Sequence, residues 1–113
     1  MQETVSADVL ATRILNDRLR QTRTGGRVML SPGIAAQGER SLAEILALIA
    51  TFNEFTTEND PYGEHDCAVI SWDGRRILFR IDYYDPTLQF CSDDPSDPDK
   101  TLRIMTVMFA SEY

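Results

Sequence analysis

The chain has 113 residues, of which 42% are hydrophobic and 26% are charged, as in an ordinary globular protein of one domain. No apolar run approaches the roughly 18 residues that a membrane-spanning helix needs, so we expect no membrane segment. The net charge of -7 comes from residues 54–99, which hold twelve acidic residues and three arginines, and this excess disfavours direct contact with nucleic-acid phosphates.

The first half of the chain predicts two helices and a short strand. Residues 7–23 repeat apolar side chains at near-helical spacing, and the glycines that follow would end this helix. Residues 27–30 are a strand candidate. Residues 39–55 carry the strongest apolar stripe, and Ser41 with a glutamate three residues later matches a capping box. The arginines of the first helix share it with two aspartates, so we interpret them as a solvated face.

The second half predicts a hairpin and a third helix. Residues 67–83 form a β-hairpin around Asp73-Gly74, a dipeptide favoured in type I′ turns. The odd positions from 77 to 81 are apolar and should face the core. Asp97-Pro98 suits a helix start, which predicts a last helix over 98–112. The expected fold is α+β, with a small antiparallel sheet of three to four strands and three helices packed on one face.

Two polar motifs flank the predicted hairpin. The first is Asn59-Asp60-Pro61-Tyr62-Gly63-Glu64-His65-Asp66, and the second is Asp82-Tyr83-Tyr84-Asp85-Pro86. A hairpin returns its two ends to the same place, so both motifs should meet at its open end. They would bring together five carboxylates, three tyrosines and the single histidine of the chain.

The residues that could carry catalysis there are His65, Asp66 and Asp82. Acid–base chemistry would need the imidazole beside a carboxylate that fixes its tautomer, and a divalent metal would need further carboxylates from across the hairpin. Neighbouring residues on an extended segment point to opposite sides, so Glu64-His65-Asp66 alone does not make a compact metal site. The chain has no nucleophile-elbow, phosphate-loop or zinc-protease motif. We therefore predict no cofactor and no metal, and we keep as an alternative an enzyme at the hairpin mouth that is assisted by a metal or based on histidine and aspartate.

Local turn chemistry and partner binding are the other two interpretations of these motifs. Asn, Asp, Pro and Gly are turn-forming residues, and Arg80 beside Asp82 could form an ion pair, so the motifs could lock the hairpin through a polar network. They could instead form a surface for another protein. The candidate partner-binding residues are Asp60, Tyr62, Glu64, His65, Asp82, Tyr84 and Asp85.

The expected compartment is the cytoplasm. The chain begins Met-Gln-Glu-Thr, without the basic and apolar regions of a signal peptide. Two cysteines, Cys67 and Cys91, do not form a disulfide framework and are expected as free thiols. Self-association through Trp72 or through the predicted last helix is a third possibility, with the oligomeric state left open.

Four stretches resemble a known family, domain of unknown function family 3768. They are residues 24–30, the motif 59–66, residues 81–88 and the C-terminal residues 110–113. The resemblance implies a small single-domain bacterial protein, found mainly in Alphaproteobacteria and often on plasmids or other mobile elements. The family has no established activity, so it implies no catalytic residue.

The sequence thus favours a small acidic interaction module that binds a protein partner with a basic surface. Carriage on mobile elements suggests plasmid maintenance, or counter-defence as an inhibitor of the anti-restriction or anti-CRISPR kind. The enzyme and the self-associating subunit remain alternatives.

Overall fold

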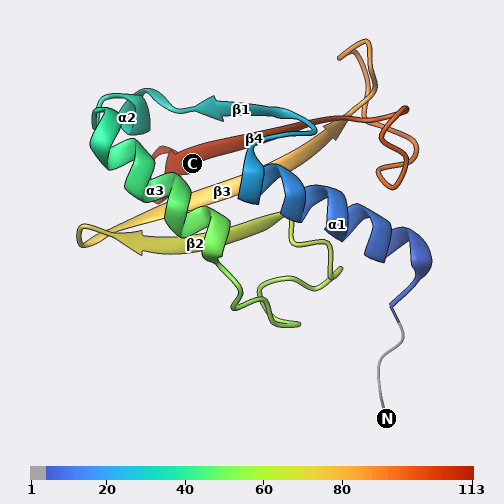
Figure 1. Cartoon of the computed structure of the whole chain (residues 1–113), viewed down its shortest axis with the longest axis horizontal. Helices are drawn as coiled ribbons and strands as arrows, with labels where there is room; N and C mark the ends of the chain where they lie inside the picture. Colours follow the sequence, from blue (N-terminus) through green and yellow to red (C-terminus); the bar gives the residue numbers. More distant parts are fainter. Residues whose placement is uncertain (1–4) are drawn as a thin grey trace.

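A four-stranded sheet carries helices on one of its faces (Figure 1). The computed structural model describes residues 5–113, so the polar start Met1–Thr4, on which the expected lack of a signal peptide depends, lies outside the described residues. The strand order is β1-β4-β3-β2, and β1 runs parallel to β4 while the other neighbours are antiparallel. The elements are α1 (Ala7–Thr22), β1 (Arg27–Leu30), α2 (Pro32–Ala35), α3 (Glu39–Thr51), β2 (Cys67–Trp72), β3 (Arg75–Tyr84), β4 (Leu102–Phe109) and the 3-10 turn η1 (Ala110–Glu112).

All three α-helices contribute to one apolar core on the same face of the sheet. Leu19 from α1, Ile34 from α2 and Ile45 from α3 are fully buried, together with strand residues such as Phe79 and Val107. The α+β class and the four strands confirm the sequence-based prediction. The sheet is mixed rather than purely antiparallel, because β1 joins the edge of β4 in the parallel sense. Within residues 5–113, no helix is long and apolar enough to cross a membrane.

The ends of the first helix follow local signals. Ser6 Oγ accepts a hydrogen bond from the Val9 amide at 3.1 Å and so caps α1. The helix ends where Arg23 adopts a left-handed conformation with φ 57°, and the Arg23 amide donates to Leu19 O at 2.7 Å. The predicted range 7–23 is therefore confirmed to within one residue.

The predicted range 39–55 is four residues too long. α3 follows Gly38, so Ser41 is not its cap, and it ends at Thr51. The buried guanidinium of Arg20 lies at this end, and its Nη1 donates to the carbonyls of Ile49 at 2.9 Å and Phe52 at 2.8 Å. A helix leaves its last carbonyls without partners, and here a side chain from α1 supplies the donors.

The predicted hairpin is confirmed. β2 and β3 pair antiparallel around Asp73 and Gly74, whose φ angles of 51° and 71° are both positive, as a type I′ turn requires. Ile77, Phe79 and Ile81 are buried against the helices, as their alternation predicted.

The predicted helix over 98–112 is wrong. Residues Leu102–Phe109 form β4, which lies between β1 and β3 and pairs with both. The Asp97-Pro98 signal belongs to a tight turn, in which the Lys100 amide donates to Asp97 O at 3.1 Å. Pairing on both edges outweighs a helical preference that was weak in the sequence, because tertiary context overrides propensity.

Candidate functional site

The first polar motif is a loop held by its own side chains. Asn59 Oδ1 accepts from the Thr56 amide at 2.7 Å, and Asn59 Nδ2 donates to Glu54 O at 2.9 Å. The buried carboxylate of Asp60 accepts from the His65 amide at 3.2 Å and 3.3 Å. These contacts are the turn chemistry that the sequence suggested.

His65 lies between two carboxylates. Its Nδ1 is 2.9 Å from Asp17 Oδ1, its Nε2 is 3.8 Å from Asp60 Oδ2, and its ring stacks on Phe55 with 3.9 Å between ring centroids. The backbone φ of 58° at His65 is left-handed, so Glu64-His65-Asp66 is not the extended segment assumed from the sequence. Asp17 can fix the tautomer of the imidazole, as acid–base chemistry requires, but the other nitrogen faces a buried carboxylate that belongs to the same loop.

A second cluster of hydrogen bonds lies beside this histidine and joins the two motifs. Asn16, which is fully buried, donates from Nδ2 to Tyr83 Oη at 2.7 Å and to Glu64 O at 3.0 Å, and its Oδ1 accepts from Arg103 Nε at 2.9 Å. Tyr83 in turn donates to Glu64 Oε1 at 3.2 Å. Burial is the main cause that raises the pKa of the Tyr83 hydroxyl and that of the Glu64 carboxyl. This network locks the mouth of the hairpin to α1.

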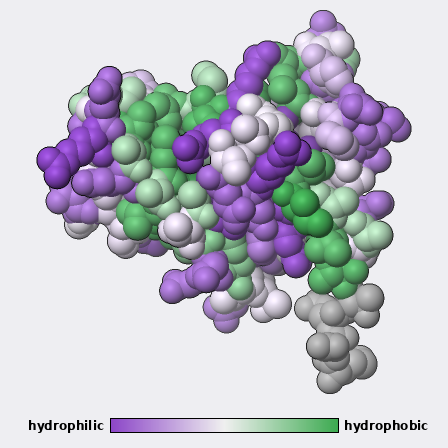
Figure 2. Space-filling model, viewed as in Figure 1, coloured by the Kyte–Doolittle hydropathy of each residue, from purple (hydrophilic) through white to green (hydrophobic). Residues whose placement is uncertain are grey.

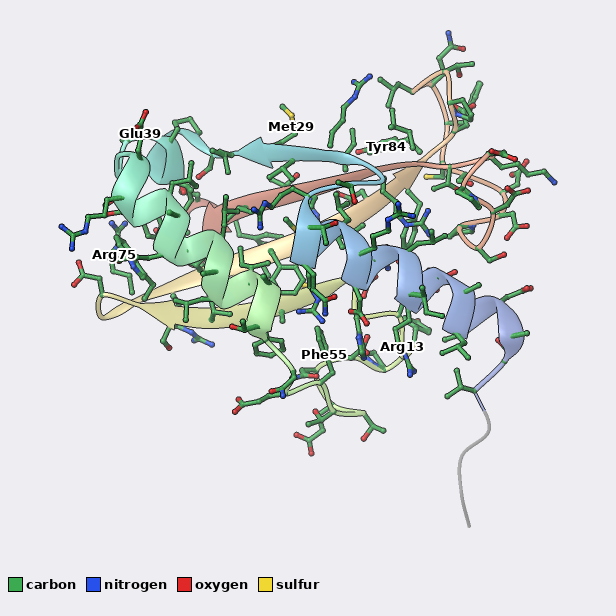
Figure 3. The ribbon with its side chains drawn as sticks, viewed as in Figure 1. Arg13, Met29, Glu39, Phe55, Arg75 and Tyr84 are labelled. Carbon is green, nitrogen blue, oxygen red and sulfur yellow. The ribbon has the colours of Figure 1, made fainter. Side chains whose placement is uncertain are left out.

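A groove of about 620 Å³ lies between the start of α1 and the loop. Arg13 and Phe55 point toward this region in Figure 3. Arg13 Nε donates to Gly63 O at 2.6 Å, so the arginine fixes the position of the loop. The residues that line the groove are Val5, Ser6, Val9, Arg13, Phe55, Thr56, Thr57, Asp60, Pro61, Tyr62, Gly63 and His65. Three of the seven candidate partner-binding residues therefore lie along one groove.

The other candidates point elsewhere. The two motifs do meet through the backbone, since the Ile81 amide donates to Asp66 O at 2.7 Å. Asp82, however, lies on the opposite face of the sheet and pairs with Arg80 at 3.1 Å. Asp85 accepts from the Thr87 hydroxyl at 2.8 Å and so stabilises its own turn, which begins after Tyr84. The structure therefore distributes the predicted cluster over three surfaces.

Neither a metal nor a reactive thiol is favoured by the geometry. Within residues 5–113, no three His, Cys, Asp or Glu side chains are grouped to hold a metal ion. Cys67 and Cys91 are free thiols. Burial raises the pKa of the Cys67 thiol, and the charge of Asp66 raises it further, which opposes thiolate formation.

Polar residues of α1 belong to the site, although the sequence did not predict this. Arg13, Asn16, Asp17 and Arg20 recur at helical spacing and face the loop and α3, whereas the apolar Leu10 and Ile14 are 46% and 59% exposed. Figure 2 shows a hydrophobic stripe along the outer side of α1. The spacing of the four polar residues was a detectable signal, but a polar stripe normally faces water.

The chain between β3 and β4 forms an acidic projection, here called the acidic loop (residues 85–99), which extends beyond the sheet at the upper right of Figure 1. It contains five aspartates and no basic residue. Buried Arg103 donates from Nη2 to Pro95 O, and Thr101 Oγ1 donates to Asp94 O at 2.8 Å. A hydrogen bond from the Ser96 hydroxyl lowers the pKa of Asp94. The loop is therefore a fixed anionic surface rather than a flexible one.

The acidic loop also exposes apolar side chains. Phe90 is 69% exposed and Leu88 is 42% exposed, near the tip of a turn closed by a hydrogen bond from the Asp85 amide to Phe90 O at 2.8 Å. Tyr84 is labelled at the base of this projection in Figure 3. Phe90 is thus an exposed aromatic side chain on a loop that carries five aspartates.

Fold and site together describe a small α+β protein with a locked polar network and an acidic projection. The family model for "Protein of unknown function (DUF3768)" matches residues 30–112, so the chain belongs to this family. The match begins after α1, so the polar stripe on that helix lies outside it. No curated protein matches the chain. No solved structure matches it either.

Proposed function

We propose that this chain is a protein-binding module and that the acidic loop binds a basic surface on its partner. The observation that carries the proposal is Phe90, an aromatic side chain that is 69% exposed on a loop fixed by internal hydrogen bonds. Aromatic residues at the centre of an interface supply much of its binding energy, and a rigid loop loses little entropy when it binds.

The charge of the loop defines the partner. The loop contains five aspartates and no basic residue, and only Lys100, the next residue in the chain, adds a positive charge beside Asp94. Hydrogen bonds lower the pKa values of Asp85 and Asp94. The loop therefore stays anionic well below neutral pH and complements a basic protein surface. A basic nucleic-acid channel is one such surface, so inhibition of a DNA-acting or RNA-acting protein, in plasmid maintenance or counter-defence, fits this chemistry.

The test is capture of the partner from the native host, followed by affinity measurement with the purified pair. Phe90→Ser should weaken binding about 30-fold, the effect of losing a central aromatic contact. A variant with Asn in place of Asp93, Asp97 and Asp99 should slow association and remove most of the salt dependence between about 0.05 and 0.5 M salt.

Tyr62→Ser is the matched control, because Tyr62 is 77% exposed but lies at the groove beside α1. It should leave the affinity unchanged. If Tyr62→Ser abolishes binding and Phe90→Ser does not, the groove is the binding surface and the acidic loop is not. Salt-independent binding would also contradict the proposal.

A further inference from the structure

The face of the sheet opposite the α-helices carries a group of apolar side chains together with three arginines and Asp82. Met29 is 54% exposed and Val69 is 41% exposed on this face. The C-terminal residue Tyr113 reaches its edge, with the ring 5.8 Å from Arg80 Cζ, but is itself 81% exposed. By strand alternation and register, the outward-facing apolar residues are Met29 and Val69 on the two edge strands and Leu78, Leu102, Ile104 and Met108 on the two central strands.

The sequence of β4 is that of a strand covered on both sides. Its inward positions are buried, and three of its four outward positions are Leu102, Ile104 and Met108, with Thr106 the only polar one. A sheet with one wet face normally alternates apolar and polar residues, and a near-continuous apolar strand is typical of a sheet covered on both faces. Within residues 5–113, the three α-helices contribute to the core on the other face, and on this side only Tyr113, which follows η1, approaches the outward-facing Arg80.

The charge of this face is opposite to that of the chain. Three arginines, Arg27, Arg76 and Arg80, and one acidic residue, Asp82, point outward. The net charge of this face is therefore +2, whereas that of the whole chain is -7. Arg80 is paired with Asp82 at 3.1 Å, whereas within residues 5–113 neither Arg27 nor Arg76 has a carboxylate within 4.0 Å.

We infer that this face of the sheet binds an acidic amphipathic helix of a partner protein. A helix fits because the apolar groups lie on the face of the sheet and not along its edge, and the row from Leu102 to Met108 is about 20 Å long, the length of a helix of about 13 residues. Carboxylates flanking the apolar stripe of that helix would meet Arg27 and Arg76. A second copy stacked face to face would bring two positive faces together.

The test uses two synthetic helical peptides of about 16 residues with the same leucine stripe, one flanked by glutamates and the other by lysines. Backbone amide shifts and fluorescence anisotropy are followed as each peptide is added to the full chain. The acidic peptide should shift the amides of Met29, Leu78 and Ile104 and bind at least about tenfold more tightly than the basic peptide.

Variants assign the binding to this face. Ile104→Gln should weaken binding about tenfold, and the double variant Arg27→Glu/Arg76→Glu should reverse the preference toward the basic peptide. Leu10→Gln is the control, because Leu10 is 46% exposed on α1, which packs against the other face of the sheet. Phe90→Ser should also leave peptide affinity unchanged, which separates this result from that of the acidic loop.

Four results would overturn the inference. They are no shift at about 1 mM acidic peptide, equal binding of both peptides, competition by single-stranded RNA for the same amides, and a dimer in sizing chromatography that Ile104→Gln dissociates. The last would assign the face to a second copy.

Discussion

At the scale of single residues, Gly26 is required by a close approach between α1 and β4. A Cβ atom at this position would lie 2.7 Å from Arg103 O and 2.9 Å from Leu19 Cδ2, and the first of these is backbone that cannot move aside. We expect Gly26→Ala to lower the free energy of unfolding by about 1–3 kcal/mol, measured by urea denaturation. Gly25→Asn is the control, since a Cβ at Gly25 meets nothing within 4 Å and asparagine tolerates its positive φ. Equal losses for both variants would contradict the steric explanation.

Glu112 fastens the C-terminal end of the chain to the start of α2. Its carboxylate accepts from Ser31 Oγ at 2.6 Å, the Phe109 amide at 2.9 Å and the Gly33 amide at 3.1 Å, and the Ser31 contact is the main cause of its lowered pKa. A lowered carboxyl pKa gives stability that is fully present above the ordinary value of 4.5 and is lost as pH falls through the lowered value.

We therefore expect Glu112→Gln to lower the Tm at neutral pH. The difference in Tm between this variant and the unsubstituted chain should disappear in acid. Thermal unfolding followed by circular dichroism at several pH values measures the difference. Glu58→Gln, at an exposed loop position, should leave the Tm unchanged throughout. A Tm difference for Glu112→Gln that is constant with pH would show that the side chain acts through packing rather than through its charge.

At the scale of elements, the hairpin, α1 and α3 were predictable because their signals are local, whereas the four-residue helix α2 was not predicted. A type I′ dipeptide, alternating apolar residues and glycines define them within a few neighbouring positions. β4 was not predictable, because both of its faces are apolar and the alternation that identifies a strand is absent. Its parallel pairing with β1 joins residues about 77 positions apart along the chain, which a local pattern does not contain.

The site was predicted in part for the same reason. The turn chemistry of residues 59–66 and the pairing of Arg80 with Asp82 follow from the motifs themselves. The partner of His65 is Asp17, which is 48 residues away on a helix whose polar stripe resembles an ordinary solvated face. Burial of that stripe becomes visible only when the helix is placed against the sheet.

The orientation of α1 leads to a prediction with a clear sign. Asn16→Ala removes the group that accepts a hydrogen bond from Arg103, which is 1% exposed, and the group that donates one to Tyr83. The substitution should lower the free energy of unfolding by about 2–4 kcal/mol. Ile14→Gln changes a side chain that is 59% exposed and should cost less than about 0.5 kcal/mol. Chemical denaturation measures both. The reverse order would mean that the apolar stripe of α1 faces the core.

At the scale of the whole molecule, two groups of carboxyls oppose each other in their response to pH. Hydrogen bonds lower the pKa values of Asp85, Asp94 and Glu112, so their stabilising contributions are lost only in strong acid. Burial, and then the charges of neighbouring carboxylates, raises the pKa of Asp66, and burial does the same for Glu64. For such groups, stability is fully present below the ordinary values of 3.8 and 4.5 and is lost as pH rises through the raised values.

The stability of the chain should therefore rise as the pH falls from neutral into mild acid, because the second group gains its contribution over this range while the first group keeps its own. Asp66→Asn removes a charge that is costly at neutral pH, so it should raise the Tm at about pH 7.5, and the gain should shrink as the pH falls. Asp73→Asn is the control, because it keeps a favoured residue at an exposed turn position with φ 51° and should not change the profile. If Asp66→Asn instead lowers the Tm at every pH, the ionised carboxylate of Asp66 makes a stabilising contact in the fold, and the rise in stability toward mild acid must then arise from Glu64 alone.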